Sequence, residues 1–255
     1  MPTALVTGAT AGLGAEFARQ LAADGYDLVL VARDTDRLEQ VGDELTRRHG
    51  RKVKLIGADL TTDEGCTAVA ERIEDRDPPI DVLVNNAGFG MYKVFGSADL
   101  ADEERQLDLN VRAVLRLSHA AVRVMTARGQ GRIVNVSSVS AFVPRGSNAT
   151  YAASKAWVTM FSEALSVQLT GSGVTVTAIC PGFTRTEFHD RAHADMSHVP
   201  DRMWLDAASV VREGLADAFE GKPVSIPSRQ YRRLVTLSRL VPRPLLRRVM
   251  ARRNF

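Results

Sequence analysis

The sequence predicts a single-domain, doubly wound α/β fold, in which a parallel sheet of about seven strands carries helices on both faces. Short runs of valine, isoleucine and leucine recur along the chain, and segments of helix length separate them. Strands that are apolar along their whole length are buried on both faces, as in parallel sheets covered by helices. The length of 255 residues is sufficient for one such domain.

The first expected strand covers residues 3–7 (TALVT), and a helical pattern through Phe17, Leu21 and Ala22 follows it. Residues 27–32 (DLVLVA) form the second expected strand. Asp34 is a suitable cap for the next helix, whose apolar positions recur at i, i+3 and i+7. Those positions are Leu38, Val41 and Leu45. The further expected strands are residues 53–57, 81–84, 132–137, 174–179 and, as a short last strand, 224–226.

Composition indicates an ordinary globular protein, with 45% hydrophobic and 25% charged residues. The first expected strand begins directly after Met1 and Pro2, which leaves no room for a signal peptide, and no apolar run has the length of a membrane span. We therefore expect a cytoplasmic protein. Cys66 and Cys180 are expected to pack as small hydrophobic residues in a reducing compartment.

A glycine-rich turn follows the first strand, with glycines at positions 8, 12 and 14 of TGATAGLG. Backbone N–H groups at such a turn, together with the positive end of a helix dipole, suit a dinucleotide pyrophosphate. The spacing G-x-x-x-G-x-G departs from the more familiar G-x-G-x-x-G pattern. Taken alone, the glycines are also compatible with a tight strand-to-helix turn that binds nothing.

Arg33 follows the end of the second strand, where an NAD-binding protein of this architecture carries a ribose-binding carboxylate. An arginine at that place can hold the 2′-phosphate of NADP through charge-assisted hydrogen bonds. Arg37, one turn later, can assist it. The alternative is a solvated arginine at a strand end.

Tyr151 and Lys155 are four residues apart near the start of an apolar-periodic segment, so they lie on one helix face. A positive charge beside a phenol favours the phenolate and lowers the phenol pKa toward the range useful in general acid and base catalysis. An ordinary pair on a helix surface has the same spacing, and the functional interpretation depends on the rest of the chain.

Several motifs in order give the chain a family resemblance. These are TGATAGLG at residues 7–14, Asp59-Leu60, NNAG at residues 85–88, Asn110 within DLNV, IVNVSS ending at Ser138, YAASK at residues 151–155 and PGFTRT at residues 181–186. With them the sequence resembles the short-chain dehydrogenase/reductase family, in its single-domain subfamily with a Rossmann fold. The resemblance extends to about residue 227.

The resemblance implies roles for individual residues. Tyr151 would be the general acid or base, and Lys155 would lower its pKa and bind the nicotinamide ribose. Ser138 would hold the substrate carbonyl oxygen, and Asn110 would anchor a water that links the lysine to solvent. Together with Arg33, the implied cofactor-binding residues are Gly8, Thr10, Gly12, Leu13, Gly14, Asp59, Leu60, Asn86, Ala87, Gly88, Tyr151, Lys155, Pro181, Gly182, Thr184 and Thr186.

The implied activity is the interconversion of a ketone and a secondary alcohol on a hydrophobic substrate, with NADP(H) preferred over NAD(H). A homodimer or homotetramer is usual in the family. The alternative is a cofactor-sensing or membrane-docked protein that uses the same fold without turnover. We expect no nucleic-acid partner, because residues 1–220 carry 23 basic and 30 acidic side chains and contain no recognition motif.

Residues 187–205 are polar and weakly periodic, and in the family's layout they would form a lid over the substrate. Phe183, Met196, Met203 and Trp204 are candidates to line an apolar substrate pocket, although Trp204 can equally pack in the core. We expect no metal site, because no organised carboxylate accompanies the histidines of this segment, which are His189, His193 and His198.

Residues 228–255 extend beyond the catalytic domain predicted for residues 1–227. Residues 221–255 contain ten basic residues and no acidic residue. Leu234, Leu237, Leu240 and Val241 can form an apolar stripe, which Pro242 and Pro244 interrupt. Two interpretations remain open: the helices pack on the subunit or its oligomer with their arginines in water, or they contact an anionic membrane surface peripherally.

Overall fold

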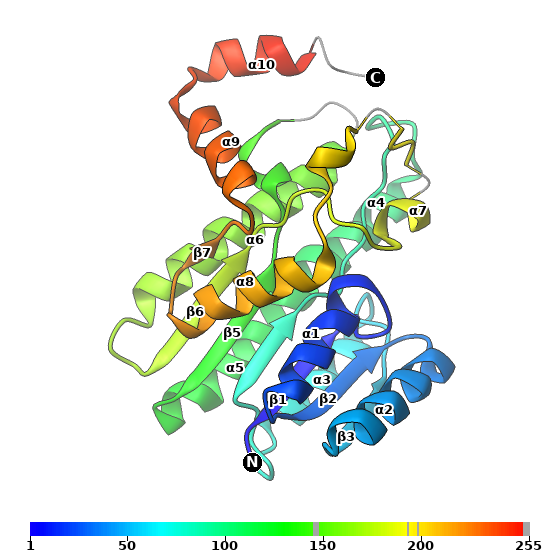
Figure 1. Ribbon diagram of the computed structural model, residues 1–255, viewed down its shortest axis with the longest axis vertical. Helices are drawn as coiled ribbons and strands as arrows, with labels where there is room; N and C mark the ends of the chain where they lie inside the picture. Colours follow the sequence, from blue (N-terminus) through cyan, green and yellow to red (C-terminus); the bar gives the residue numbers. More distant parts are fainter. Residues whose placement is uncertain (145–147, 193, 198, 252–255) are drawn as a thin grey trace.

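A computed structural model describes residues 1–144, 148–192, 194–197 and 199–251, and its centre is a seven-stranded parallel sheet (Figure 1). The strand order is β3-β2-β1-β4-β5-β6-β7. This confirms the predicted fold class, with ends shifted by one residue in β4, β5 and β7. The strands are β1 (Thr3–Thr7), β2 (Asp27–Ala32), β3 (Val53–Gly57), β4 (Val82–Asn85), β5 (Gly131–Val136), β6 (Val174–Ile179) and β7 (Val224–Ser225).

Helices cover both faces of the sheet. One layer contains α1, α2 and α8, and the other contains α3, α5 and α6. The helices are α1 (Gly12–Ala23), α2 (Thr35–His49), α3 (Asp63–Glu74), α4 (Leu100–Leu107), α5 (Ala113–Arg128), α6 (Ala149–Gln168), α7 (Phe188–Arg191), α8 (Ala207–Phe219), α9 (Arg229–Leu240) and α10 (Arg243–Ala251).

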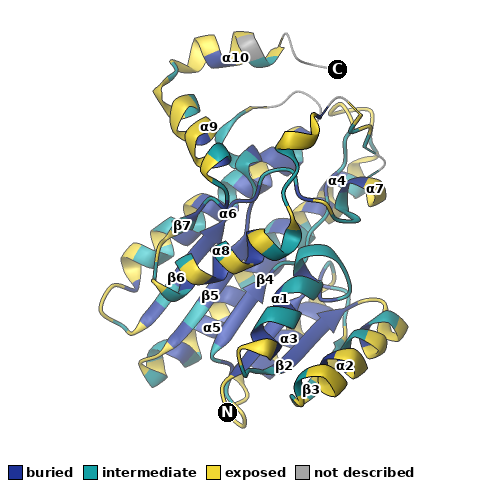
Figure 2. Ribbon diagram, viewed as in Figure 1, coloured by how far each residue is buried: buried dark blue, intermediate teal, exposed yellow. Residues whose placement is uncertain are grey.

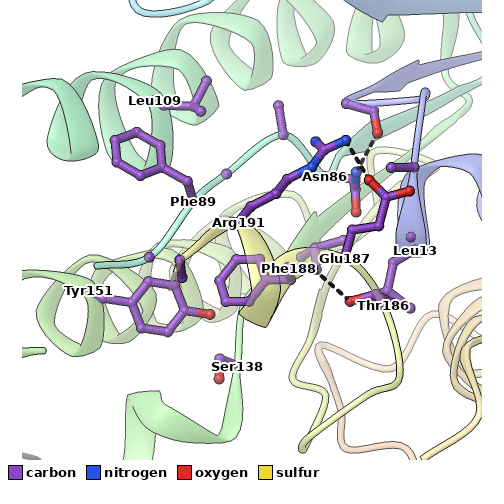
Figure 3. Close-up of a pocket in the computed structure, with 18 of the residues that line it drawn as sticks. Leu13, Asn86, Phe89, Leu109, Ser138, Tyr151, Thr186, Glu187, Phe188 and Arg191 are labelled. Carbon is purple, nitrogen blue, oxygen red and sulfur yellow. Dashed lines mark hydrogen bonds and ion pairs between the residues drawn. The ribbon is translucent and has the colours of Figure 1, made fainter. Parts of the chain in front are cut away.

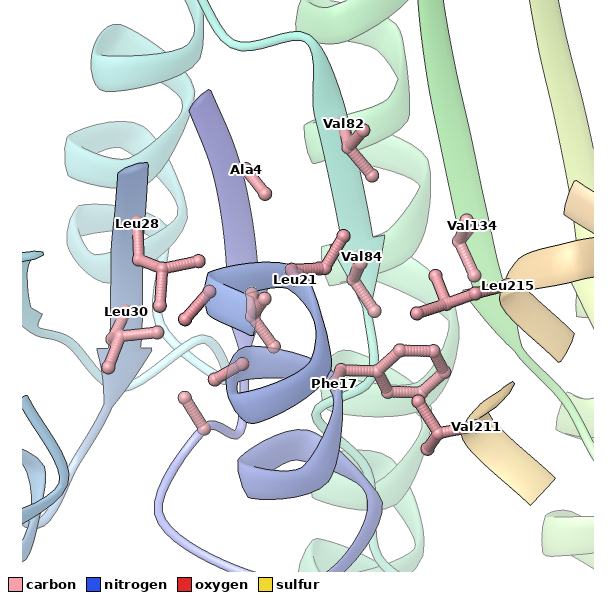
Figure 4. Close-up of a cluster of buried hydrophobic side chains, with 14 of the residues drawn as sticks. Ala4, Phe17, Leu21, Leu28, Leu30, Val82, Val84, Val134, Val211 and Leu215 are labelled. Atoms are coloured by element: carbon pink, nitrogen blue, oxygen red, sulfur yellow. The ribbon is translucent and has the colours of Figure 1, made fainter. Parts of the chain in front are cut away.

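The side chains of each strand alternate between two hydrophobic cores. Leu28 and Leu30 of β2 enter the core beneath α1 and α2, whereas Val29 and Val31 enter the core beneath α3 and α5. Figure 4 shows the first core, where Phe17 of α1 lies among residues of the sheet and of α8. Both faces of the sheet are therefore buried from solvent, as expected for strands that are apolar along their whole length.

Helix α2 begins as the sequence predicts. The Asp34 side chain accepts a hydrogen bond of 3.0 Å from the Arg37 backbone N–H and satisfies one free donor of the first turn. Leu38 and Leu45 are buried and Val41 is partly buried against the sheet. The apolar residues that recur along this helix thus form the face that packs on the core.

The strand order reverses beside β1, which pairs with β2 on one side and with β4 on the other. Loops that leave the carboxyl ends of these strands diverge at such a point, and ligands bind in the resulting crevice. The glycine-rich turn, Arg33 and the NNAG segment lie at the carboxyl ends of β1, β2 and β4.

The C-terminal helices leave the body at the carboxyl end of the sheet (Figure 1). Helix α9 packs on the body through Tyr231 and Val235, both buried. It ends at Leu240, and α10 begins at Arg243, so Pro242 lies between the two helices and Pro244 lies in the first turn of α10. The division of the chain at residue 227 stays a prediction.

Two expectations about the whole chain can be compared with the structure. Cys66 and Cys180 are free and fully buried. Within the described ranges, no helix has the length and apolar content needed to cross a membrane.

Candidate active site

A cavity of about 920 Å³ opens at the carboxyl ends of the strands (Figure 3). Loops after β1, β2, β3, β4, β5 and β6 contribute to its wall. The crevice at the sheet's reversal point is therefore a real cavity that brings together most of the residues singled out from the sequence.

The glycine-rich turn forms one end of this cavity, and Gly8, Thr10, Gly12 and Leu13 line it. Gly8 and Gly12 have φ angles of +66° and +54°, which other residues rarely adopt. Gly14 does not line the cavity. A Cβ on Gly14 would lie 2.0 Å from the Gly8 carbonyl oxygen, so this glycine permits close packing of α1 beneath the turn.

The segment after β4 supports the turn from the side. The Asn86 side-chain amide donates to the carbonyl oxygens of Thr7 (2.9 Å) and Gly8 (3.2 Å). The Thr7 hydroxyl accepts from the backbone N–H groups of Asn86 and Ala87, both at 3.0 Å. Asn86, Ala87 and Gly88 also line the cavity. Their observed contacts hold the turn in shape.

Arg33, Asp59 and Leu60 line the cavity at the ends of β2 and β3. The Arg33 guanidinium lies 3.8 Å from the Asp59 carboxylate, and 62% of its side chain is exposed. Partial burial acts to raise the pKa of Asp59, but hydrogen bonds from Thr61 and the charge of Arg33 outweigh it and lower the pKa. Asp59 is thus a carboxylate at neutral pH, and Arg33 keeps donors available toward the cavity.

Arg37 does not line the cavity. Its side chain reaches the segment before α7, where the guanidinium forms a bidentate ion pair with Glu187. Arg191 also donates to Glu187, at 2.7 Å. The Arg37 hydrogen bond is the main cause of the lowered pKa of Glu187. The expected lid and helix α2 are therefore joined by an ion pair, a connection that the sequence does not predict.

Tyr151 and Lys155 lie on one face of α6, as their spacing predicts, and both line the cavity. The Lys155 Nζ lies 5.8 Å from the centre of the Tyr151 ring and donates to the Val136 carbonyl oxygen at 2.8 Å. Burial lowers the pKa of Lys155 from 10.5 to about 8. The ammonium is thus buried beside the phenol without a carboxylate partner among the described residues.

Ser138 ends the loop after β5 and lies on the hydroxyl side of Tyr151 (Figure 3). Its Oγ caps a short 3₁₀ turn by accepting from the Ser140 N–H at 3.1 Å. The Ser138 hydroxyl proton remains available to donate toward the cavity. The structure therefore brings two hydroxyl donors to one side of the cavity.

Asn110 lies in a single π-helical turn, residues Asp108–Arg112, between α4 and α5. Its side chain accepts from the Phe89 N–H at 3.1 Å and donates to the Phe89 carbonyl at 2.9 Å. It also donates to the Ser154 hydroxyl at 3.3 Å. Asn110 lies behind the cavity wall, where it fixes the segment after β4. Its expected water stays a prediction.

The PGFTRT segment follows β6, and Pro181, Gly182, Thr184 and Thr186 all line the cavity. A Cβ on Gly182 would lie 2.1 Å from the Tyr231 ring of α9. The Tyr231 hydroxyl accepts from the Phe183 N–H at 3.1 Å and donates to the Met203 carbonyl at 2.8 Å. The C-terminal helix α9 therefore holds this wall of the cavity in place.

Aromatic and aliphatic side chains surround the part of the cavity next to Tyr151. The Phe188 ring lies 5.8 Å from the Tyr151 ring, and both side chains lie close together in Figure 3. Of the four pocket candidates from the sequence, Phe183 lines the cavity. Met196, Met203 and Trp204 are not among the described lining residues, and Trp204 instead packs on Phe183. The apolar residues at this end include Phe89, Leu109, Phe183 and Phe188.

Phe89, Leu109 and Phe188 are missed by the sequence analysis, although each has a signal. Phe89 follows NNAG, Leu109 precedes Asn110, and Phe188 comes two residues after PGFTRT. Neighbours of loop motifs at the carboxyl ends of strands are candidates for lining the same crevice.

His189 is buried within an aromatic group, where its Nδ1 lies 3.2 Å from the Tyr92 hydroxyl and its ring contacts Trp204 edge to face. His193 and His198 lie outside the described residues. In the part of the chain that the structure describes, no three His, Cys, Asp or Glu side chains form a group suited to a metal ion.

Comparison with known proteins agrees with this geometry. Residues 2–197 match the short chain dehydrogenase family. The Escherichia coli K12 oxidoreductase UcpA is 35% identical over 223 residues, which cover 86% of this chain and 83% of UcpA. The Nostoc ketoacyl reductase HetN is 34% identical over 71% of this chain and 63% of its own length.

Two solved structures extend the similarity. A short-chain dehydrogenase from Sphingobium yanoikuyae in complex with NADPH has a TM-score of 0.85 and 36% identity, covering 90% of this chain and 89% of that one. A bulky-bulky ketone specific alcohol dehydrogenase from Comamonas testosteroni has a TM-score of 0.82 and 31% identity, covering 94% and 92%. This chain belongs to the short-chain dehydrogenase/reductase family, whose members are oxidoreductases that use NAD(P)H.

Proposed function

We propose that the protein is an NADP(H)-dependent oxidoreductase that interconverts a ketone and a secondary alcohol on a hydrophobic substrate. The observation that carries this proposal is the position of Tyr151: its ring lies in the cavity wall with a buried lysine on one side and Ser138 near its hydroxyl.

The residues at the other end of the cavity fit a nicotinamide dinucleotide. Backbone N–H groups of the glycine-rich turn would bind a pyrophosphate at the start of α1, and the positive φ angles of Gly8 and Gly12 give the turn its shape. Arg33 and Asp59 would face the adenosine part, and the lysine would bind the nicotinamide ribose. When bound, the cofactor supplies or accepts the hydride.

The chain's own residues would manage the substrate oxygen and its proton. The Ser138 and Tyr151 hydroxyls would donate hydrogen bonds to the carbonyl oxygen, on which negative charge develops during reduction. Tyr151 would transfer its proton to that oxygen, and the Lys155 ammonium would stabilise the phenolate left behind. In the direction of alcohol oxidation the same phenolate would accept the proton.

The NADP preference rests on Arg33. It follows β2 at the position where a ribose carboxylate would favour NAD, and its exposed guanidinium faces the cavity. The NADPH complex of the Sphingobium relative supports the same assignment. The apolar lining around Tyr151 favours a hydrophobic substrate, and the ketone specificity named for the Comamonas relative is consistent with it.

The competing function is a cofactor sensor on the same fold. We favour the enzyme because a sensor has no need of a proton donor, a second hydroxyl and a buried ammonium at one point. We further propose a homodimer or homotetramer in the cytoplasm, as is usual in the family, which light scattering would test.

The deciding experiment follows NADPH oxidation against a panel of bulky ketones, aldehydes and β-ketoacyl thioesters. Tyr151→Phe removes the proton donor but keeps the ring, and we expect its turnover to fall about a hundred- to ten-thousandfold. Tyr26→Phe is the matched control, because Tyr26 stacks on Phe219 away from the cavity. Normal turnover of Tyr151→Phe would refute the mechanism. NADPH binding without turnover on any substrate would favour the sensor.

A further inference from the structure

Helices α9 and α10 carry an exposed surface of leucines and arginines. The exposed fractions are 44% for Leu234, 59% for Leu237, 75% for Leu240 and 52% for Leu245. Figure 2 shows much of both helices in the colour of exposed residues. We call these four leucines, with the exposed Arg233, Arg243, Arg247 and Arg248, the Arg/Leu surface.

The charge of this surface has a single sign. Residues 221–255 contain ten basic side chains and no acidic one, whereas the rest of the chain has a net charge of −7. Arg232 pairs with Glu213 of α8, and Arg239 lies over the Phe142 ring. The four arginines of the Arg/Leu surface form no ion pair with any carboxylate of the described residues. Their charges are therefore left for an external partner.

The leucines of α9 are not the face by which that helix packs. Tyr231 and Val235 are buried against the body, and the Tyr231 hydroxyl is held by the Phe183 N–H and the Met203 carbonyl. At 100° per residue, Leu234, Leu237 and Leu240 lie on a different side of the helix. The packing face thus fixes the helix so that the leucines point away from the body.

We propose that the Arg/Leu surface docks the protein on an anionic lipid bilayer. Leucines of an interfacial helix enter the boundary of the acyl chains, while arginines remain at the level of the headgroups. A guanidinium also binds phosphate through two parallel hydrogen bonds.

A second copy of this chain is the less suitable partner. A protein interface that buried the leucines would also bury the neighbouring arginines, and each buried guanidinium would need a carboxylate placed to meet it. A lipid surface supplies mobile phosphates and needs no such match. After Pro242 helix α10 runs in a different direction from α9 (Figure 1), which spreads the arginines over a wider area.

Docking would have a consequence for substrate access, and this consequence rests on the proposed function. Helix α9 contacts Gly182 and Phe183, which line the cavity, and both C-terminal helices lie at the same end of the molecule as the site (Figure 1). A docked protein would hold the cavity near the bilayer, where hydrophobic ketones concentrate.

The test is flotation of the full chain with vesicles of phosphatidylglycerol and phosphatidylcholine in equal parts, compared with pure phosphatidylcholine. We expect binding to the anionic vesicles that is at least tenfold tighter and that weakens in about 0.5 M salt. Replacing Arg243, Arg247 and Arg248 by Gln should weaken it about a hundredfold, at about fivefold for each charge. Replacing Leu237, Leu240 and Leu245 by Ser should weaken it at least tenfold.

The matched control is Leu55→Ser, on the sheet edge strand β3, which should bind like the wild type. Circular dichroism would establish that each variant is folded. Three results would overturn the proposal: no binding to anionic vesicles, full binding by the leucine variant, or a wild-type oligomer that the arginine variant dissociates without vesicles. NADPH oxidation in solution does not depend on docking, so loss of binding and loss of the proposed activity are separate results.

Discussion

Replacement of Lys155 by methionine should make the stability of the protein respond differently to pH. Lys155 is 5% exposed and lies without a carboxylate partner among the described residues, so burial lowers its pKa from 10.5 to about 8. A depressed lysine pKa means that the folded protein holds this proton less tightly than the unfolded chain does. Each unit by which the pKa is lowered corresponds to about 1.36 kcal/mol, so the buried charge costs about 3 kcal/mol of folding free energy.

The sign of the pH dependence follows from these two pKa values. Below pH 8 both the folded and unfolded states are protonated, and the full cost is present. Between pH 8 and 10.5 the folded protein has lost the proton while the unfolded chain still binds it, so wild-type stability rises. Lys155→Met lacks this contribution. From pH 7 to pH 10 its stability relative to wild type should fall by about 2–3 kcal/mol.

The assay is urea denaturation of both proteins without cofactor at pH 7 and pH 10. The quantity compared between the two pH values is the stability of the variant minus that of the wild type. Other titrating groups contribute equally to both proteins and cancel, and so does the loss of the hydrogen bond to the Val136 carbonyl, which is the same at both pH values. The exposed residue Lys54 supplies the control variant Lys54→Met, whose difference from wild type should be the same at both pH values. A difference for Lys155→Met that does not change with pH would refute a buried ammonium at this position.

Three further predictions concern the cofactor end of the cavity. Arg33→Ala should raise the KM for NADPH about ten- to a hundredfold and the KM for NADH much less. Arg48→Ala on α2 is the control. Equal effects of Arg33→Ala on the two KM values would refute the NADP assignment. Glu187→Gln frees Arg37 and should improve NADPH affinity several-fold over NADH, with stability changed by less than about 1 kcal/mol in thermal melts. Gly14→Ala places a Cβ 2.0 Å from the Gly8 carbonyl and should cost about 1–3 kcal/mol of stability and most cofactor affinity; normal NADPH titration would contradict this reason for the glycine.

The sequence predicts the sheet and the glycine-rich end of the cavity well because local patterns determine both. Apolar runs such as residues 27–32 must be buried on two faces, and the glycines of the first turn have backbone requirements that few other residues meet. Tyr151 and Lys155 are neighbours through helix geometry alone. In each case the relevant spacing is shorter than a dozen residues.

The end of the cavity next to Tyr151 cannot be derived in this way, because its wall is assembled from distant segments. Phe89 follows β4, Leu109 lies in the π-helical turn before α5, and Phe188 begins α7. Each is next to a motif, but only the folded chain brings the three together. Trp204 illustrates the converse. Its large aromatic side chain suits a pocket wall, but in the structure it packs against Phe183 and His189.

Arg37 shows how a prediction from position alone can be incomplete. Its place one turn after Arg33 suggests a contact with the 2′-phosphate, and the structure instead pairs it with Glu187, 150 residues away. The 2′-phosphate and the Glu187 carboxylate are both anionic, so they would compete for the Arg37 guanidinium. The pair is also more than one-third exposed on both sides, and an exposed ion pair contributes at most about 1 kcal/mol. A bound 2′-phosphate, with its larger charge, could therefore displace Glu187 at small cost. Recognition of the phosphate would then be coupled to the segment that carries Phe188, which lies against Tyr151.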